Sequence, residues 1–337
     1  MLNVQIVLFD GFDLLDAIAP YEVFFAAEMS VPGSLSVSFV TAEGPRSVAS
    51  GVNGVKLEAS SRLDPDCAGI IIVPGACGTL DGDGPDSIPA ILARVNTELA
   101  GLLQQALGQP DLIVGTVCGG SLVLAMGGLI EGRPAVTNHL GMELLAATGA
   151  IPIHARVVDD GDLVTAGGVT AGLDLALYLV ERELGPQIAL AVEQLFEYER
   201  RGTVWRAQGM APSPSKLMAG GEPEHPASES QQDNGAKPSA FDGEWDTSIA
   251  TPVGKMLVKL RISTSNGTIQ GTATQGDDVI DFINAELRGS QLCWSLRITK
   301  PMRLNLKFEV SVDGGQMSGI AKAGLLPASK LTGVRIS

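Results

Sequence analysis

The chain has 337 residues, 45% of them hydrophobic, and a formal net charge of −15 at pH 7. Its length favours two domains, and its hydrophobic content is that of a folded protein with a sizeable core rather than of a disordered chain. The acidic charge, with no obvious cluster among the 23 lysines and arginines, argues against nucleic acid as a partner, because the phosphate backbone needs a basic face.

Neither a targeting segment nor a metal-binding motif is visible in the sequence. The beginning, MLNVQIVLFDGF, lacks the basic and long apolar regions of a signal peptide, and no run approaches the roughly 20 apolar residues of a membrane span. We therefore expect a cytoplasmic protein without a membrane partner. The histidines are far apart in sequence, and no C-x-x-C pair occurs, so we expect free thiols and no structural metal site. The cysteines are Cys67, Cys77, Cys118 and Cys293.

Strands and helices alternate over the first 110 residues. The four consecutive apolar residues at 70–73 indicate a fully buried parallel strand. Pro20 is expected to bend or restart the helix in which it lies. The other predicted elements are a strand at 2–9, a helix at 12–28, a strand at 35–41, a hairpin at 48–59 and an amphipathic helix at 88–107.

Asp16 lies in the middle of the apolar residues of the first helix. A solvated carboxylate would be unremarkable there, but its neighbours Leu15, Ala17 and Ile18 indicate a partly buried position just beyond the end of the first strand. Burial raises the pKa of a carboxyl group, so that the group can keep its proton. Asp16 is therefore a candidate acid.

The stretch LIVGTVCGGSLVLAMGGL, residues 112–129, predicts a buried strand, a sharp turn and a helix, with the thiol of Cys118 at the turn. A side chain there faces the positive end of the following helix, which favours the thiolate. The two glycines after it bring amide donors close to the atom that the sulfur attacks. The alternative interpretation is an ordinary buried cysteine, because free cysteine is among the most buried residue types.

Other predicted strand ends also carry residues of interest. The glycine-rich loop at 75–84 can offer backbone N–H groups to an anion, although it lacks the GxxxxGK[ST] pattern of a phosphate loop. Cys77 in this loop is a second reactive thiol or, more simply, a packed loop residue. His139, which follows Asn138 at a strand end, is a hydrogen-bond partner or a base. The remaining predicted elements are a strand holding His154, which we interpret as structural, a turn at Asp160-Gly161, a strand ending at Gly167-Gly168, and helices from there and from Gln187 to about Trp205.

This succession predicts a doubly wound α/β domain, whose ligands bind at the carboxyl ends of the parallel strands. Cys118, the loop at 75–79, Asn138-His139 and the run 167–170 all follow predicted strands. We therefore expect them to converge on one edge of the sheet.

The second half of the chain has a different pattern. Residues 208–240 are rich in Pro, Ser, Gly, Gln and Glu, which predicts a flexible linker. Beyond it the period becomes two, and eight short strands are predicted, with turns at 266–267 and 313–315. Such a meander favours a small closed barrel, filled by side chains or holding one small ligand, with Trp245 and Trp294 in its core. We thus expect a first domain at 1–207, the linker, and a barrel at 241–337.

Residues 1 to about 207 resemble the DJ-1/PfpI superfamily. The resemblance is carried by Cys118 in TVCGGSLVLA, by Asp16 in LFDGFDLLDAIAPYEVF, by the loop IIIVPGACG and by the run VVDDGDLVTAGGVTAGLDLAL. Within the superfamily the chain looks most like the isonitrile hydratase branch, which shares an I-P-x-H-x-R-V-V-x-D-G segment. This resemblance implies a flavodoxin-like fold and a homodimer without metal or organic cofactor. The barrel lies outside it, and its G-x-W opening at Gly243–Trp245 loosely resembles a lipocalin-like barrel, for which an apolar ligand is conceivable.

The resemblance also implies a reaction and its residues. Cys118 corresponds to the nucleophile and Asp16 to its acidic partner in a hydro-lyase that converts an isonitrile and water into an N-substituted formamide. A thiolate that attacks the isonitrile carbon and an acid that protonates it fit this chemistry. The groups expected to line the substrate site are Gly75, Ala76, Gly119, Asn138, His139, Gly168 and Thr170.

The chain departs from the pattern of these relatives at two positions. Gly119 stands where protease-like members have histidine and the hydratases have threonine, and Ala76 replaces the second glycine of a P-G-G turn. The change at Gly119 argues against Cys-His hydrolysis and weakens the assignment of the substrate.

Two other functions stay open on the sequence. One is a glyoxalase or deglycase acting on small α-oxo aldehydes, with His139 or Asp16 as the base. The other is a non-enzymatic sensor that is oxidised at Cys118 and binds a ligand or partner through the barrel. A transcriptional regulator is less well supported, because the second half is β and the chain is acidic.

Overall fold

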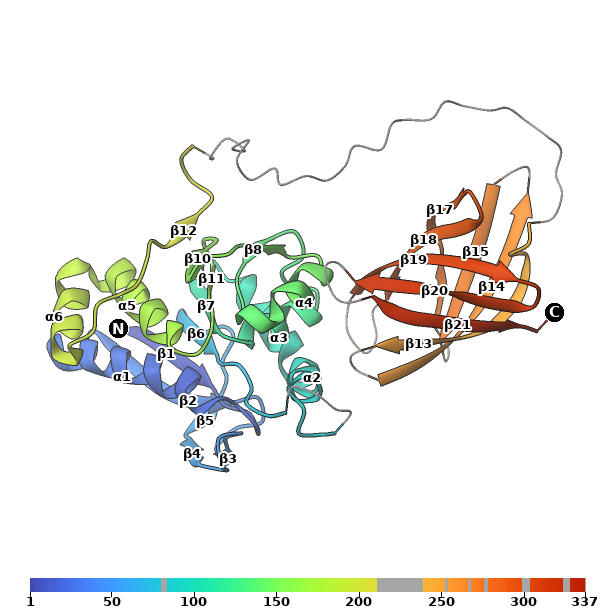
Figure 1. Cartoon of the computed structure of the whole chain (residues 1–337). Coiled ribbons are helices and arrows are strands. Elements are labelled where there is room, and N and C mark those ends of the chain that lie inside the picture. The colour runs from blue at the N-terminus through green and yellow to red at the C-terminus, as the bar shows by residue number, and fades with distance from the viewer. Residues whose placement is uncertain are drawn as a thin grey trace.

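The computed structural model describes residues 1–79, 84–210, 239–251, 254–265, 268–275, 278–298, 304–323 and 328–336. Most of the predicted linker at 208–240 and the predicted turn at 266–267 lie outside these residues. The described residues form two hydrophobic cores, one in the N-terminal α/β part and one in the C-terminal β part (Figure 1).

A mostly parallel sheet forms the centre of the N-terminal part. Its five central strands are parallel and lie in the order β2-β1-β6-β7-β11, which is the order of a flavodoxin-like fold. This confirms the predicted fold class. β10 pairs with β11 in the antiparallel sense, and β5 and β12 extend the two edges. The strands are β1 (Leu2–Val7), β2 (Leu35–Thr41), β5 (Ser61–Arg62), β6 (Gly69–Val73), β7 (Leu112–Val117), β10 (Val157–Asp159), β11 (Leu163–Ala166) and β12 (Trp205–Arg206).

Helices cover both faces of this sheet. α1, α5 and α6 contact one another on one side, and α2, α3 and α4 form the layer on the other side (Figure 1). Asp13 caps α1 by accepting from the N–H groups of Leu15 and Asp16, and the Ser87 hydroxyl caps α2. The helices are α1 (Leu14–Ser30), α2 (Ile88–Leu107), α3 (Gly120–Met126), α4 (Met142–Ala147), α5 (Ala171–Leu184) and α6 (Pro186–Phe196), with a short 3-10 helix at His139–Gly141.

Short strands complete the N-terminal part. The predicted excursion after the second strand is an antiparallel hairpin of β3 (Arg46–Ala49) and β4 (Lys56–Ala59). β8 (Pro134–Ala135) pairs with β9 (Ile151–Pro152) on the way into and out of α4.

Three local predictions in this part need correction. Pro20 was expected to bend or restart its helix, and the restart is wrong because Pro20 lies inside one continuous helix α1. α6 ends at Phe196 instead of about Trp205, because Glu197 adopts a left-handed conformation (φ 48°, ψ 40°) that ends the helix. His154 is an exposed residue of the loop between β9 and β10 rather than part of a strand.

The C-terminal part is an all-antiparallel, nearly closed barrel of nine strands (Figure 1). The order is β16-β15-β14-β13-β21-β20-β19-β18-β17, so its two edge strands follow each other in the chain. Eight strands were expected, with residues 279–289 as a single strand. The structure divides this run at Phe282, whose N–H donates to the carbonyl of Gly271 (2.8 Å). The strands are β13 (Gly243–Thr251), β14 (Gly254–Ser265), β15 (Thr268–Gln275), β16 (Asp278–Asp281), β17 (Ile283–Arg288), β18 (Gln291–Ile298), β19 (Leu304–Asp313), β20 (Gln316–Ala323) and β21 (Ser329–Arg335).

Aromatic side chains occupy the barrel core, as predicted. Trp245 is fully buried, its Nε1 donates to the carbonyl of Phe241 (2.8 Å), and the Arg335 guanidinium lies 4.6 Å from its ring centre. The Trp294 ring is stacked between those of Phe282 and Phe308, with ring centres 4.6 and 4.8 Å away. These residues give the barrel a core of its own.

The barrel meets the N-terminal part beside α4. Ala147, at the end of this helix, packs with the barrel core, and Arg297 of β18 forms an ion pair with Glu131 (2.9 Å). In the part of the chain that is described, no helix combines the length and the apolar character needed to cross a membrane.

Candidate active site

The turn between β7 and α3 holds Cys118 in a strained conformation. Its backbone φ is +55°, which residues with a side chain seldom adopt. The Cys118 N–H donates to the carbonyls of Ala166 (3.1 Å) and Gly167 (2.9 Å), and its carbonyl accepts from the Thr137 hydroxyl (2.7 Å). These bonds fix the residue at the carboxyl end of β7, with 8% of its surface exposed.

Asp16, in the first turn of α1, is completely buried beside this cysteine. Its Oδ2 accepts from the N–H of Gly75 (2.9 Å). Its Oδ1 has no hydrogen-bond partner of normal geometry among the described residues. The Cys118 thiol is close enough to interact with the carboxyl group and lowers its pKa, against the stronger effect of burial. One carboxyl oxygen is thus anchored, and the other is free to exchange a proton with a neighbour.

Gly75 brings the loop after β6 against the pair. A β-carbon at this position would lie 2.6 Å from the backbone nitrogen of Gly119 and 2.8 Å from Oδ2 of Asp16, distances at which atoms clash. Only glycine allows this approach. The loop, α1 and the β7–α3 turn therefore meet at one sheet edge, where strand ends were expected to converge.

Three hydrogen-bond donors surround the sulfur of Cys118. Nδ2 of Asn138 lies 3.4 Å from Sγ, and the backbone N–H groups of Val169 and Gly119 are close enough to lower the pKa of the thiol. Each lowers the pKa of the thiol, because a donor stabilises the thiolate. The sulfur is therefore held among donors contributed by three separate turns.

Burial nevertheless outweighs these donors. Burial, followed by the charge of Asp16, raises the pKa of Cys118 to about 12. Burial, followed by the charge of Asp13, raises the pKa of Asp16 to about 8. The prediction that Asp16 can keep its proton agrees with this direction. The start of the next helix favours the thiolate, as predicted, since the Gly119 N–H lowers the pKa of the thiol, but desolvation of the sulfur is the larger effect.

The other residues expected at the site lie at different distances from the pair. Ala76 is buried and forms an isolated bridge with Phe12. Gly168 lets Asn138 pack closely, since a β-carbon there would lie 2.7 Å from Nδ2 of Asn138. The Thr170 hydroxyl accepts from Nη2 of Arg156 (3.0 Å), and His139 is exposed at the start of the 3-10 helix. No contact of His139 with the sulfur is seen among the described residues.

Position 119 has room for a side chain. A β-carbon there would lie 3.5 Å from Cδ1 of Leu92 and 3.6 Å from Cα of Gly75, which are ordinary contact distances. The φ of Gly119 is −69°, which suits any residue. Position 119, beside Cys118 and Ala76, can therefore accept a β-carbon without a clash.

Sequence reasoning missed the residues that hold the turn at 167–170. Val169 acts through its backbone N–H, and such a donor cannot be recognised from the residue type. Asp174, however, carried the signal that identified Asp16, a single carboxylate in an apolar helix. It is 2% exposed and accepts from Nε of Arg156 (2.6 Å). Within the described residues, no group of three or more histidine, cysteine, aspartate or glutamate side chains could hold a metal ion.

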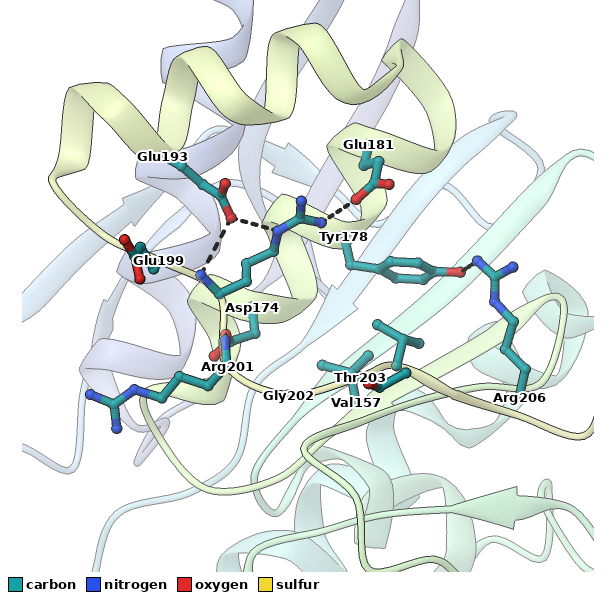
Figure 2. Close-up of a pocket in the computed structure, with 12 residues that line it drawn as sticks. Val157, Asp174, Tyr178, Glu181, Glu193, Glu199, Arg201, Gly202, Thr203 and Arg206 are labelled. Atoms are coloured by element: carbon teal, nitrogen blue, oxygen red, sulfur yellow. Dashed lines mark hydrogen bonds and ion pairs between the residues drawn. The ribbon is translucent and has the colours of Figure 1, made fainter.

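A pocket of about 570 Å³ lies elsewhere in the N-terminal part, between α5, the segment after α6 and β12 (Figure 2). Neither Cys118 nor Asp16 lines it. Its polar groups largely satisfy one another: Arg200 pairs with two glutamates, and Arg206 donates to the hydroxyl of Tyr178 (Figure 2). This pocket is therefore distinct from the site of the cysteine.

Comparisons with known sequences agree on the N-terminal part. Residues 3–182 match the model of the DJ-1/PfpI family. The isonitrile hydratase of Pseudomonas putida is 34% identical over 199 residues, which covers 58% of this chain and 78% of the hydratase. The HTH-type transcriptional regulator GbdR of Pseudomonas aeruginosa is 28% identical over 179 residues, but the match spans only 48% of the regulator.

Solved structures of similar proteins include a ThiJ/PfpI family protein from Pseudomonas syringae, with a TM-score of 0.49 and 24% identity over 64% of this chain and 78% of the other. DJ-1beta of Drosophila melanogaster gives a TM-score of 0.48 with 16% identity, over 59% of this chain and 98% of the other. The family match ends at residue 182, so the barrel lies outside it.

Proposed function

The chain belongs to the DJ-1/PfpI family, and from this premise we propose that its N-terminal part is a cysteine-dependent hydro-lyase that hydrates an isonitrile to an N-substituted formamide. Cys118 is the nucleophile, and Asp16 is the acid and base. The similarity to the isonitrile hydratase of Pseudomonas putida supports the choice of substrate class.

The position of Asp16 next to Cys118 is the main support for the proposal. The carboxyl group of Asp16 is buried next to Cys118, with Oδ2 held by the Gly75 N–H and Oδ1 without a hydrogen-bond partner of normal geometry in the part of the chain that is described. A carboxyl group whose pKa is raised to about 8 exchanges protons readily near neutral pH. An isonitrile carbon needs both a nucleophile and a proton, which this pair supplies from two neighbouring atoms.

In the first step, the Asp16 carboxylate takes the proton of the Cys118 thiol, and the sulfur attacks the terminal carbon of R–N≡C. Asp16 then gives the same proton to that carbon, which produces the thioimidate R–N=CH–S–Cys118. The N–H groups of Val169 and Gly119 and the Asn138 amide stabilise the negative sulfur before attack.

In the second step, Asp16 removes a proton from a water molecule as its oxygen attacks the thioimidate carbon. Asp16 gives this proton to the nitrogen and takes the proton of the newly added hydroxyl group as the C–S bond breaks, which releases R–NH–CHO. The sulfur leaves as a thiolate, which Asp16 reprotonates. The net reaction adds one water to the isonitrile and regenerates both side chains.

Turnover of a simple isonitrile tests the proposal. We expect the full-length protein to convert cyclohexyl isocyanide to N-cyclohexylformamide, followed by NMR, and Cys118→Ala to lose this activity. His139→Ala should retain it, because this exposed side chain does not contact the sulfur. Absence of turnover by the parent protein, or equal turnover by Cys118→Ala, contradicts the proposal. Methylglyoxal in place of the isonitrile tests the aldehyde chemistry in the same assay.

A further inference from the structure

The backbone N–H of Val169 lowers the pKa of the Cys118 thiol, and the turn that carries it is bonded to Cys118, whose own N–H donates to the carbonyl of Gly167 (2.9 Å). Val169 lies in the turn between β11 and α5 with φ +25°, outside the conformations that β-branched residues normally adopt. A strained turn persists only where the surrounding structure holds it in place. The groups that hold residues 167–170 therefore determine whether this N–H stays directed at the sulfur.

Arg156 brackets this turn from both ends. Its backbone carbonyl accepts from the N–H of Gly167 (3.0 Å), and its Nη2 donates to the hydroxyl of Thr170 (3.0 Å). Val169 lies between these two attachment points. One residue thus fixes the beginning and the end of the segment that carries the donor.

Arg156 is in turn held by a buried carboxylate. Its Nε donates to Oδ2 of Asp174 (2.6 Å), which is 2% exposed. Asp174 also accepts from the hydroxyl of Tyr198 (2.9 Å) and the backbone N–H of Arg201 (2.7 Å). Three donors fix this carboxylate at the wall of the pocket in Figure 2, so the guanidinium is oriented by a rigid partner.

We propose that Arg156 is a positioning residue, which with Thr170 and Asp174 holds the Val169 N–H against the sulfur of Cys118 and so sets the reactivity of the thiol. The inference rests on the proposed role of Cys118 as the nucleophile. Arg156 bonds to Gly167, Thr170 and Asp174, so it acts on the sulfur through the turn.

A purely structural ion pair would stabilise the fold without changing the thiol. The chain offers a matched control in Arg133, which bonds to Asp160 (2.6 Å) and Asp162 (2.5 Å) in the same part of the molecule and is similarly half-buried. Arg133 does not touch the turn at 167–170 in the described structure. Its loss should reduce stability without changing Cys118.

The experiment measures the rate at which iodoacetamide alkylates Cys118 as a function of pH, by mass spectrometry of the Cys118 peptide in full-length protein. In Arg156→Gln, loss of the N–H···S bond should slow alkylation at pH 8 by about threefold to tenfold and move the profile to higher pH. Thr170→Val should move it in the same direction, whereas Thr170→Ser, which keeps the hydroxyl, and Arg133→Gln should retain the parent profile.

Thermal unfolding of each variant identifies loss of the fold, and the nearly isosteric Thr170 variants decide the question if Arg156→Gln does not fold. Superimposable profiles for the parent and Thr170→Val, or an equal shift in Arg133→Gln, overturn the inference. The readout needs no isonitrile. If the variants shift the alkylation profile but the parent protein does not hydrate the isonitrile, only the proposed function is contradicted. If the parent protein hydrates the isonitrile but the variants leave the alkylation profile unchanged, only the role of Arg156 is contradicted.

Discussion

Cys118 and Asp16 lie together in a buried site, where a charge on either side chain costs free energy because it is removed from water. Because burial raises both pKa values, the pair holds two protons at neutral pH, one on the thiol and one on the carboxyl group. The proposed first step begins from a pair that holds a single proton, which is on the Cys118 thiol while Asp16 is ionised. We therefore expect the hydration rate to rise with pH as the pair loses its first proton near pH 8.

The Asp16→Asn variant distinguishes the role of Cys118 as nucleophile from the role of Asp16 as acid. The charge of Asp16 raises the pKa of Cys118, so its removal should lower the thiol pKa and speed alkylation of Cys118 several-fold at pH 9. Hydration should nevertheless be lost, because the amide cannot transfer the proton. Slower alkylation, or retained hydration, would show that Asp16 does not play both roles.

Unfolding measurements provide the control for this variant. The pKa of Asp16 is raised from 3.8 to about 8 in the folded state, so the folded protein holds this proton more tightly than the unfolded chain. The group therefore contributes stability that is lost as pH rises from about 4 to 8. Asp16→Asn should be the more stable protein at pH 9, by on the order of a few kcal/mol, and should lose this advantage near pH 4.

Gly119→Thr tests whether the absence of a side chain at position 119, next to Cys118, determines substrate choice. The backbone at 119 suits any residue, and a β-carbon there makes only ordinary contacts, so the free energy of unfolding should change by less than about 1 kcal/mol. The larger side chain should lower kcat/KM for bulky isonitriles more than for small ones, in a panel of graded size. A uniform effect across the panel would mean that position 119 does not line the substrate site.

The sequence allowed Cys118 and Asp16 to be identified because both carry local signals, a thiol at a strand-to-helix turn and a carboxylate among apolar residues. The Val169 donor could not be predicted, since it is a backbone group placed by the packing of β11 against β7. The raised pKa of Cys118 was missed for a related reason. A helix terminus is visible in sequence, whereas the extent of burial depends on the whole fold.

At the scale of elements, the residue that caps α1 also affects the pKa of the proposed acid. Asp13 caps the helix by accepting from Leu15 (3.0 Å) and Asp16 (3.4 Å), and its charge raises the pKa of the Asp16 side chain. The first turn of α1 therefore supports the acid structurally and electrostatically at once.

Asp13→Asn should distinguish the two effects. Asparagine caps helices as well as aspartate but carries no charge, so the pKa of Asp16 should fall and the pH–rate profile should shift to lower pH by up to about one unit. Asp13→Ala should shift the profile similarly and also cost about 1 kcal/mol of unfolding free energy by thermal denaturation. An unshifted profile in both variants would contradict the coupling.

Long periodic elements could be predicted from sequence, and their ends could not. The helix at 88–107 and the strand at 35–41 are predicted to the residue, because their patterns are strong and their caps are local. The end of α6 depends on the backbone of Glu197, and the break between β16 and β17 depends on a hydrogen bond from Phe282 to another strand. Neither feature alters the pattern of residue types.

At the scale of the whole molecule, α1 and α6 pack together in the helix layer on the side of the sheet away from the barrel (Figure 1). Four of their apolar side chains are about half exposed or more. Large apolar side chains that are exposed on neighbouring helices are typical of a protein interface when they form a patch. We propose that two copies of the chain associate through α1 and α6. The side chains are Phe25 (46%), Met29 (63%), Leu190 (53%) and Leu195 (62%).

Light scattering after size-exclusion chromatography tests this proposal. The parent protein should have the mass of two chains, and Met29→Glu combined with Leu195→Glu should have the mass of one, because two buried charges disfavour the interface. Leu257→Glu is the matched control, since this leucine is 72% exposed on the barrel. A parent protein that runs as a single chain, or a dimer that persists in the double variant, would contradict the assignment.

Rapid-quench mass spectrometry of the protein mixed with cyclohexyl isocyanide tests most directly whether the sulfur of Cys118 bonds to the isonitrile carbon. We expect an added mass equal to that of the isonitrile on the Cys118 peptide. The adduct should appear before formamide accumulates and should be absent from Cys118→Ala. Formamide production without such an adduct, or an adduct on Cys77 instead, would contradict the account.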